Sequence, residues 1–153
     1  MREAPTIFVS VPVSSLSAEH NASQFGRRLS ELLSSIRQGF PEAEIYCAAE
    51  EIMRTGKYST PRDATKKDLE ALEQAKLILF LYPIAVPTSA LIELGYAIAQ
   101  HKKIVCVTPS VKTLPFIAQS LHELLPNYHL VEADIFDETS APLVLSSLRN
   151  ALD

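Results

Sequence analysis

The chain has 153 residues, of which 47% are hydrophobic and 21% charged, and its formal net charge is −4. These values predict one globular domain, and the negative charge argues against a surface for nucleic acid or an anionic membrane. No apolar run approaches the roughly 18 residues of a membrane span, and no signal peptide is visible, so we expect a cytoplasmic protein. Cys47 and Cys106 lie in apolar runs and are expected to be buried free thiols. No Cys/His spacing resembles a metal site, and we expect neither metal nor cofactor.

Strands and helices alternate along the first half of the chain. Residues 6–11, TIFVSV, are a β-branched and aromatic run that predicts a strand. Residues 44–48, EIYCA, predict a second strand, and residues 50–61 are polar, contain a glycine and a proline, and predict a long loop. Between the two strands, residues 17–38 predict an amphipathic helix, because apolar side chains recur there at three- and four-residue spacing: Phe25, Leu29, Leu32, Leu33 and Ile36.

The second half continues the alternation. Residues 64–75 place Leu69, Leu72 and Ala75 on one face and predict a helix. Residues 76–82, KLILFLY, are the clearest strand, since six apolar residues follow one another, as expected where both faces of a sheet are covered. The remaining segments predict, in order, a helix over 87–100, a strand over 103–108, a helix over 114–125, a strand over 128–133 and a helix over 140–152.

Five strands that alternate with helices predict an α/β fold, built from parallel βαβ units. We expect a single domain, residues 1–153, with a doubly wound, flavodoxin-like sheet of strand order 2-1-3-4-5. In such sheets ligands bind beyond the carboxyl ends of the strands, near the point where the strand order reverses. The loops that follow residues 6–11 and 76–82 are therefore the predicted site. An antiparallel pairing of these two strands would contradict the prediction.

One carboxylate interrupts the apolar helix predicted over residues 87–100. The neighbours of Glu93 leave almost no polar face, so the first two turns are expected to be buried nearly all round. A buried carboxylate costs free energy unless it is hydrogen-bonded or has a chemical task. At the rim of the crevice, Glu93 is well placed to attack a sugar carbon or to stabilise an oxocarbenium ion. A purely structural, solvent-facing glutamate is the alternative.

Other polar residues near the expected crevice have two interpretations each. Asp68 follows Lys66 and Lys67 on the preceding helix, where a solvated mixed-charge face and a functional role both stay open. The hydroxyls of Thr88 and Ser89 at the start of the glutamate helix suit a phosphate or sugar, or simply cap the helix. Four serines surround the end of the first strand: Ser10, Ser14, Ser15 and Ser17. The sequence contains neither GxGxxG nor GxxxxGK[ST], which disfavours a usual dinucleotide-binding fold and a P-loop.

Two consecutive segments resemble a known family. DLEALEQAKLILF (68–80) and SALIELGYAIAQHKKIVCV (89–107) resemble the nucleoside 2-deoxyribosyltransferase-like superfamily, which includes deoxynucleoside monophosphate N-glycosidases. In that superfamily a helix with the pattern D-L-x-x-L-x-Q-A-D precedes a strand, a loop and the segment E-L-G-x-A-x-A-x-x-K-x-I. The resemblance covers residues 62–108, and the opening IFVSVP (7–12) is similar to the family's I-Y-x-A-G-P.

The resemblance implies roles for individual residues. Glu93 matches the nucleophilic glutamate that attacks the anomeric carbon, and Asp68 matches the aspartate that supports the site and the leaving base. Ser89 and Thr88 lie where the family's loop contacts sugar or phosphate. The family needs no cofactor and takes a nucleoside or nucleotide as substrate. The further candidates for substrate contact are Phe8, Ser10, Pro12 and Tyr82.

The chain departs from the family pattern at four places. Phe8 stands where the family has a tyrosine that orients the glutamate, Val11 replaces a glycine, and Lys76 replaces an aspartate. The loop YPIAVPTSA (82–90) lacks the D-x-G-T that precedes the family's glutamate. These departures keep a non-catalytic nucleotide-binding module open as an alternative.

A second resemblance gives an alternative substrate. Residues 55–83 and TSALIEL (88–94) are similar to TIR-type NAD hydrolases, which cleave an N-glycosidic bond with a glutamate on the equivalent helix. NAD hydrolysis or cyclisation, with release of nicotinamide, is therefore the second candidate activity. Members of the nucleoside 2-deoxyribosyltransferase-like superfamily complete their sites across subunits. The resemblance therefore implies a homodimer or larger assembly, with Tyr96 or Gln100 near the interface.

Overall fold

The computed structural model describes residues 5–12, 22–55 and 60–153. Its centre is a five-stranded sheet in the order β2-β1-β3-β4-β5, and every neighbouring pair is parallel. The strands are β1 (Thr6–Ser10), β2 (Glu44–Tyr46), β3 (Leu77–Leu81), β4 (Lys103–Thr108) and β5 (Tyr128–Glu132). The α/β fold and the strand order predicted from the sequence are confirmed.

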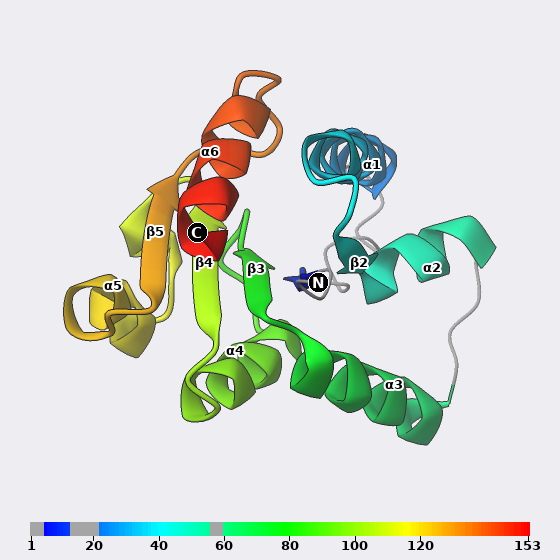
Figure 1. Ribbon diagram of the computed structural model, residues 1–153, viewed down its shortest axis with the longest axis horizontal. Helices are drawn as coiled ribbons and strands as arrows, with labels where there is room; N and C mark the ends of the chain where they lie inside the picture. The colour runs from blue at the N-terminus through cyan, green and yellow to red at the C-terminus, as the bar shows by residue number, and fades with distance from the viewer. Residues whose placement is uncertain (1–4, 13–21, 56–59) are drawn as a thin grey trace.

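Helices cover both faces of the sheet (Figure 1). The long helices α1 (Ala22–Gly39) and α6 (Ser140–Leu152) lie on one face, and α3 (Pro61–Gln74) and α4 (Ala90–Ala99) lie on the other. Successive side chains of a strand point to opposite faces, so Ile7 and Val9 enter the core beneath α1 and α6. Phe8 enters the core on the α3 and α4 side. Successive residues of β1 therefore face, in alternation, the layer of α1 and α6 and the layer of α3 and α4.

The central strand β3 is buried throughout. All five of its side chains, LILFL, have no exposed surface, and β3 pairs with β1 on one side and β4 on the other. Burial on both faces explains why the sequence of this strand is continuously apolar rather than alternating. The central position expected for residues 77–82 is confirmed.

The long loop expected over residues 50–61 is wrong for residues 50–55 and for Pro61, and residues 56–59 lie outside the described residues. A short helix, α2 (Ala48–Thr55), follows β2 directly, and α3 begins at Pro61 after the cap Thr60, whose Oγ1 accepts from the N–H of Asp63 at 3.2 Å. Helix α2 is only eight residues long, so its period is hard to see in the sequence, and Glu50 in its first turn complements the helix dipole. Arg37 of α1 also anchors Glu50, with an Nη2–Oε1 distance of 2.6 Å.

Two other expected elements are shorter in the structure. The second strand ends at Tyr46 rather than at residue 48, because α2 already begins at Ala48. The helix expected over 114–125 is a 3₁₀ segment, η3 (Phe116–Ser120), followed by a single α turn, α5 (Leu121–Leu124). A separate 3₁₀ turn, η2 (Val111–Thr113), precedes them.

Helix α4 is less buried than its apolar sequence indicates. Ala90, Leu94 and Ala97 are buried against the sheet, but Ile92 on the opposite side is 74% exposed. The expectation that the first two turns are buried nearly all round is therefore wrong for the single chain. The expected homodimer, with Tyr96 or Gln100 near its interface, stays a prediction.

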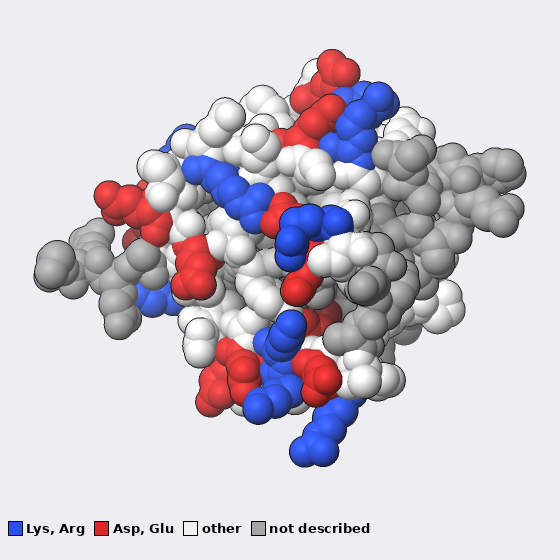
Figure 2. Space-filling model, turned by 90° about the vertical axis from the view of Figure 1, so that its right-hand side faces the viewer, with Lys and Arg blue, Asp and Glu red and all other residues white. Residues whose placement is uncertain are grey.

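The described surface carries charges of both signs. On the side of the molecule shown in Figure 2, Lys and Arg side chains alternate with Asp and Glu side chains. Some charged side chains of the described residues pair between neighbouring elements, such as Lys67 of α3 with Glu51 of α2 at 3.8 Å. Within the part of the chain that the structure describes, no helix is both long and apolar enough to span a membrane.

Candidate active site

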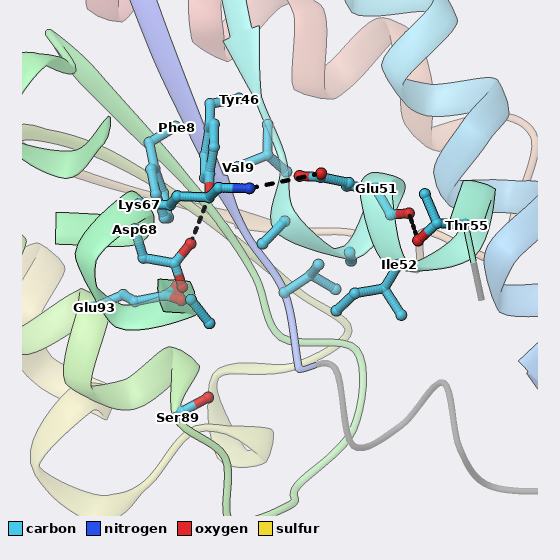
Figure 3. Close-up of a pocket in the computed structure, with 14 residues that line it drawn as sticks. Phe8, Val9, Tyr46, Glu51, Ile52, Thr55, Lys67, Asp68, Ser89 and Glu93 are labelled. Carbon is cyan, nitrogen blue, oxygen red and sulfur yellow. Dashed lines mark hydrogen bonds and ion pairs between the residues drawn. The ribbon is translucent and has the colours of Figure 1, made fainter. Parts of the chain in front are cut away.

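A cavity of about 330 Å³ lies at the carboxyl end of β1, between α2, α3 and α4 (Figure 3). Phe8 and Val9 of β1 and Tyr46 of β2 line it, and α2 forms a further wall. The neighbours of β1 are β2 on one side and β3 on the other, so the strand order reverses here. The cavity therefore lies at the switch point where open α/β sheets bind ligands.

Glu93 enters this cavity from the first turn of α4. It lies three residues after Ala90 and one before Leu94, both buried, so the helix turns the carboxylate toward the sheet. Ser10, the last residue of β1, donates its hydroxyl hydrogen to Oε2 of Glu93 at 2.7 Å. Burial raises the pKa of Glu93 from 4.5 to about 7, the Ser10 hydrogen bond opposes this, and the charge of Asp68 adds to it.

Asp68 reaches the same cavity from α3. The hydroxyl of Tyr46 donates to its Oδ1 at 2.7 Å. Burial raises the pKa of Asp68, and the Tyr46 hydrogen bond lowers it. The structure thus brings together the two carboxyl groups that the sequence singled out, and each accepts a hydrogen bond from a hydroxyl at the end of a neighbouring strand.

The Ser10 hydrogen bond gives a direct test of how Glu93 is held. A donor to the ionised carboxylate stabilises the charged form, so Ser10→Ala is expected to raise the pKa of Glu93 further. A hydrogen bond to a charged group contributes about 1.5–3 kcal/mol, which corresponds to a rise of roughly one to two units. Carbon-13 NMR titration of the glutamate carboxyl measures it. Ser140→Ala, which removes a buried serine hydroxyl of α6, is the control, and an unchanged Glu93 titration in Ser10→Ala would contradict this account.

The remaining predicted site residues occupy different places. Phe8 lines the cavity, and its ring stacks on that of Tyr46 at 5.2 Å between centroids. Ser89 also lines the cavity, at the start of α4. Pro12 is buried just after β1 and is not part of the cavity lining. Ser14, Ser15 and Ser17 lie outside the described residues.

Two of the predicted residues shape the loop that leads into α4. The hydroxyl of Tyr82 donates to the carbonyl of Val86 at 2.7 Å and accepts from its N–H at 3.2 Å. Thr88 Oγ1 accepts from the N–H of Ala90 at 3.3 Å, which satisfies one of the free donors at the helix start. Neither residue lines the cavity, and both act on the position of the first turn that carries Glu93.

Sequence reasoning missed one wall of the cavity. Ala48, Ala49, Ile52 and Thr55 line it from α2, where the sequence pattern indicated mostly loop. Tyr46 was also missed, because the expected strand order does not say which residues of the first two strands are partners. In the structure Tyr46 is the partner of Phe8 in the register of β1 and β2.

Lys67 was expected on a solvated face, and it lies at the edge of the cavity. Its Nζ is 3.8 Å from Oε1 of Glu51, with both side chains more than half exposed. Among the described residues, no group of three or more His, Cys, Asp or Glu side chains is arranged to hold a metal ion.

Comparison with known proteins shows what this fold resembles. The sequence matches no protein-family model and no curated protein. The structure is similar to that of the CMP N-glycosidase BcmB of Clostridium botulinum, with a TM-score of 0.63 and 19% identity over 95% of this chain and 98% of that one. The chain has the nucleoside 2-deoxyribosyltransferase-like fold.

A second solved structure is similar to this fold over most of its length. It is a conserved protein of Enterococcus faecalis V583, with a TM-score of 0.55 and 16% identity over 94% of this chain and 87% of that one. At these identities the likeness establishes the fold, and the site residues must be judged by their own geometry.

Proposed function

We propose that the protein cleaves the N-glycosidic bond of a nucleoside or nucleotide and transfers the ribosyl or deoxyribosyl group to water or to another base. The observation that carries this proposal is the pair of carboxyl groups, Glu93 and Asp68, in one cavity at the switch point of the sheet. The shared fold with an enzyme described as a CMP N-glycosidase supports the same class of reaction.

Glu93 is the proposed nucleophile. Its ionised carboxylate attacks C1′ of the sugar, the C–N bond breaks, and the bonding electron pair stays with the nitrogen of the leaving base. The product of this step is a glycosyl ester of Glu93. A water molecule or an acceptor base then attacks C1′, and Glu93 leaves as a carboxylate. The Ser10 hydroxyl holds Glu93 in place throughout, through its 2.7 Å bond to Oε2.

Asp68 is the proposed partner in proton transfer. In the first step it gives a proton to the departing base, and in the second it takes a proton from the attacking water. Burial raises the pKa of Glu93 to about 7, and the charge of Asp68 adds to this rise. The two groups interact, so their titration belongs to the pair. The reaction uses the form with the charge on Glu93 and the proton on Asp68.

The size of the cavity favours a mononucleotide. About 330 Å³ is near the lower end of the range of roughly 300–1,000 Å³ found for ligand sites. The stacked rings of Phe8 and Tyr46 form an aromatic wall that suits the face of a base. A TIR-like reaction on NAD would use the same two carboxyl groups on a larger substrate, and so it is the second outcome that an assay must separate.

A substrate panel tests this function. Purified protein is incubated with cytidine, CMP, deoxy-CMP, the other nucleosides and monophosphates, and NAD, and free base is measured by chromatography. We expect release of base from one or more nucleosides or monophosphates, and addition of a second base reveals transfer. Nicotinamide released from NAD alone would assign the TIR-like activity. No base from any substrate, with the nucleotides bound intact, would assign a binding module.

A further inference from the structure

Tyr46 makes contacts that no sequence expectation assigned to it. It is the last residue of β2, an edge strand of three residues, and lies opposite Phe8 in the parallel register with β1. The two rings stack with centroids 5.2 Å apart and an angle of 27°. Phe8 is 1% exposed, so a buried ring supports one face of Tyr46. This packing fixes where the phenol hydroxyl lies.

The fixed hydroxyl points at Asp68. Figure 3 shows Tyr46 and Asp68 directed toward one another at the end of the cavity where Glu93 lies. The hydroxyl donates to Oδ1 of Asp68 at 2.7 Å, and Oδ2 has no hydrogen bond to another of the described residues. A carboxyl group held by one oxygen to a rigid donor has a defined plane. Its second oxygen is then available for a proton.

We propose that Tyr46 is the positioning residue for Asp68, and that it holds Oδ1 so that Oδ2 carries the proton that the leaving base receives. This inference rests on the proposed function and assigns the acid side of the reaction to a tyrosine on β2. Phe8 of β1 has no hydroxyl. Its partner on the neighbouring strand β2, Tyr46, supplies the phenol hydroxyl at this place.

The chemistry of the phenol suits this role. Burial raises the pKa of Tyr46 far above its ordinary value, and the bond to Asp68 adds to the rise, so the hydroxyl stays protonated and always donates. Its donated hydrogen bond lowers the pKa of Asp68 against the effect of burial. Of the other charged groups, Glu93 lies across the cavity from α4, and Lys67 is paired with Glu51 at the rim. None of these groups replaces the phenol as the donor to Oδ1.

The test compares two leaving groups. Tyr46→Phe removes only the hydroxyl and keeps the stacked ring. With a substrate whose base needs a proton to leave, such as CMP, we expect kcat to fall at least tenfold and KM to change less than about threefold. With a nucleotide of a cationic base, which leaves as a neutral molecule without a proton, we expect kcat to change less than about threefold. Equal losses with both substrates, or no loss with either, would overturn the proposal.

Two further measurements separate this proposal from the proposed function. In an Asp68→Asn background, Tyr46→Phe is expected to have no additional effect on kcat, because Tyr46 acts through Asp68. If the parent protein releases no base, carbon-13 NMR titration of the Asp68 carboxyl decides alone: Tyr46→Phe should raise its pKa. An unchanged Asp68 titration would overturn the proposal whatever the activity. Tyr128→Phe, on a buried ring of β5 outside the cavity, is the matched control.

Discussion

Glu93→Gln is expected to reduce base release by a factor of roughly 1,000 or more. Glutamine has nearly the same volume as glutamate, and its carbonyl oxygen can still accept the hydrogen bond from Ser10, so the fold is retained. The amide has no negative charge with which to bond to C1′ or to stabilise an oxocarbenium ion. A thousandfold loss corresponds to about 4 kcal/mol of transition-state stabilisation.

The measurement is kcat/KM on the best substrate of the panel, with the melting temperature of each variant taken beside it. Glu70→Gln is the matched control, because it makes the same chemical change at an exposed residue of α3 outside the cavity. We expect Glu70→Gln to keep the parent rate. A folded Glu93→Gln protein that releases base at the parent rate would end the assignment of Glu93, and Asp68→Asn would then be the next variant.

The same substitution is expected to stabilise the fold in alkaline solution. The pKa of Glu93 is raised from 4.5 to about 7, so the folded state prefers the protonated carboxyl. A raised folded-state pKa contributes stability that is fully present below pH 4.5 and is lost as the pH rises through about 7. Between pH 5 and pH 8 this loss is about 2 to 3 kcal/mol of the free energy of unfolding. The amide introduced by Glu93→Gln cannot ionise, so the variant avoids this loss.

Urea unfolding of the parent protein and of Glu93→Gln at pH 5 and pH 8 measures this difference. We expect the two proteins to have similar stability at pH 5 and Glu93→Gln to be more stable at pH 8. Taking the difference between the variants removes the contributions of the other titrating groups, since these are common to both. Parallel curves over the whole range would mean that burial does not raise the pKa of Glu93.

Together the two expected results distinguish a catalytic role of Glu93 from a structural one. A structural acid would lose stability when its carboxylate is removed, whereas Glu93→Gln is expected to gain stability and lose activity. This combination is characteristic of a group held in an unfavourable environment for the sake of a reaction.

The arrangement of the sheet could be predicted because the strong patterns are also the buried ones. The apolar run of β3 and the period of α1 both report burial directly, and parallel connections leave few possible strand orders. Helix α2 could not be predicted in this way. It is eight residues long, buries only Ala49 fully, and is held in part by the Arg37–Glu50 ion pair with α1, which local sequence does not reveal.

The candidate site was predicted in part for the same reason. Glu93 stands out because a carboxylate interrupts an apolar helix, and its position on the chain indicates the cavity. Tyr46 does not stand out, since a tyrosine at the end of a strand fits a purely structural role equally well. Its importance arises from the register with Phe8 and from the approach of Asp68 on α3, and both are long-range contacts.

The cavity lies between an inner part of the sheet and its edge strand β2. Ser10 is on β1, pairs with Phe80 of β3 and holds Glu93. Tyr46 is on β2, an edge strand joined to β1 through three residue pairs, and the α2 wall follows it. We therefore expect that side chains on the α2 wall, such as Ala48 and Ile52, can be replaced without disturbing the position of Glu93. Under the proposed function, such substitutions are expected to change the preferred base and to leave Ser10 and Glu93 in place.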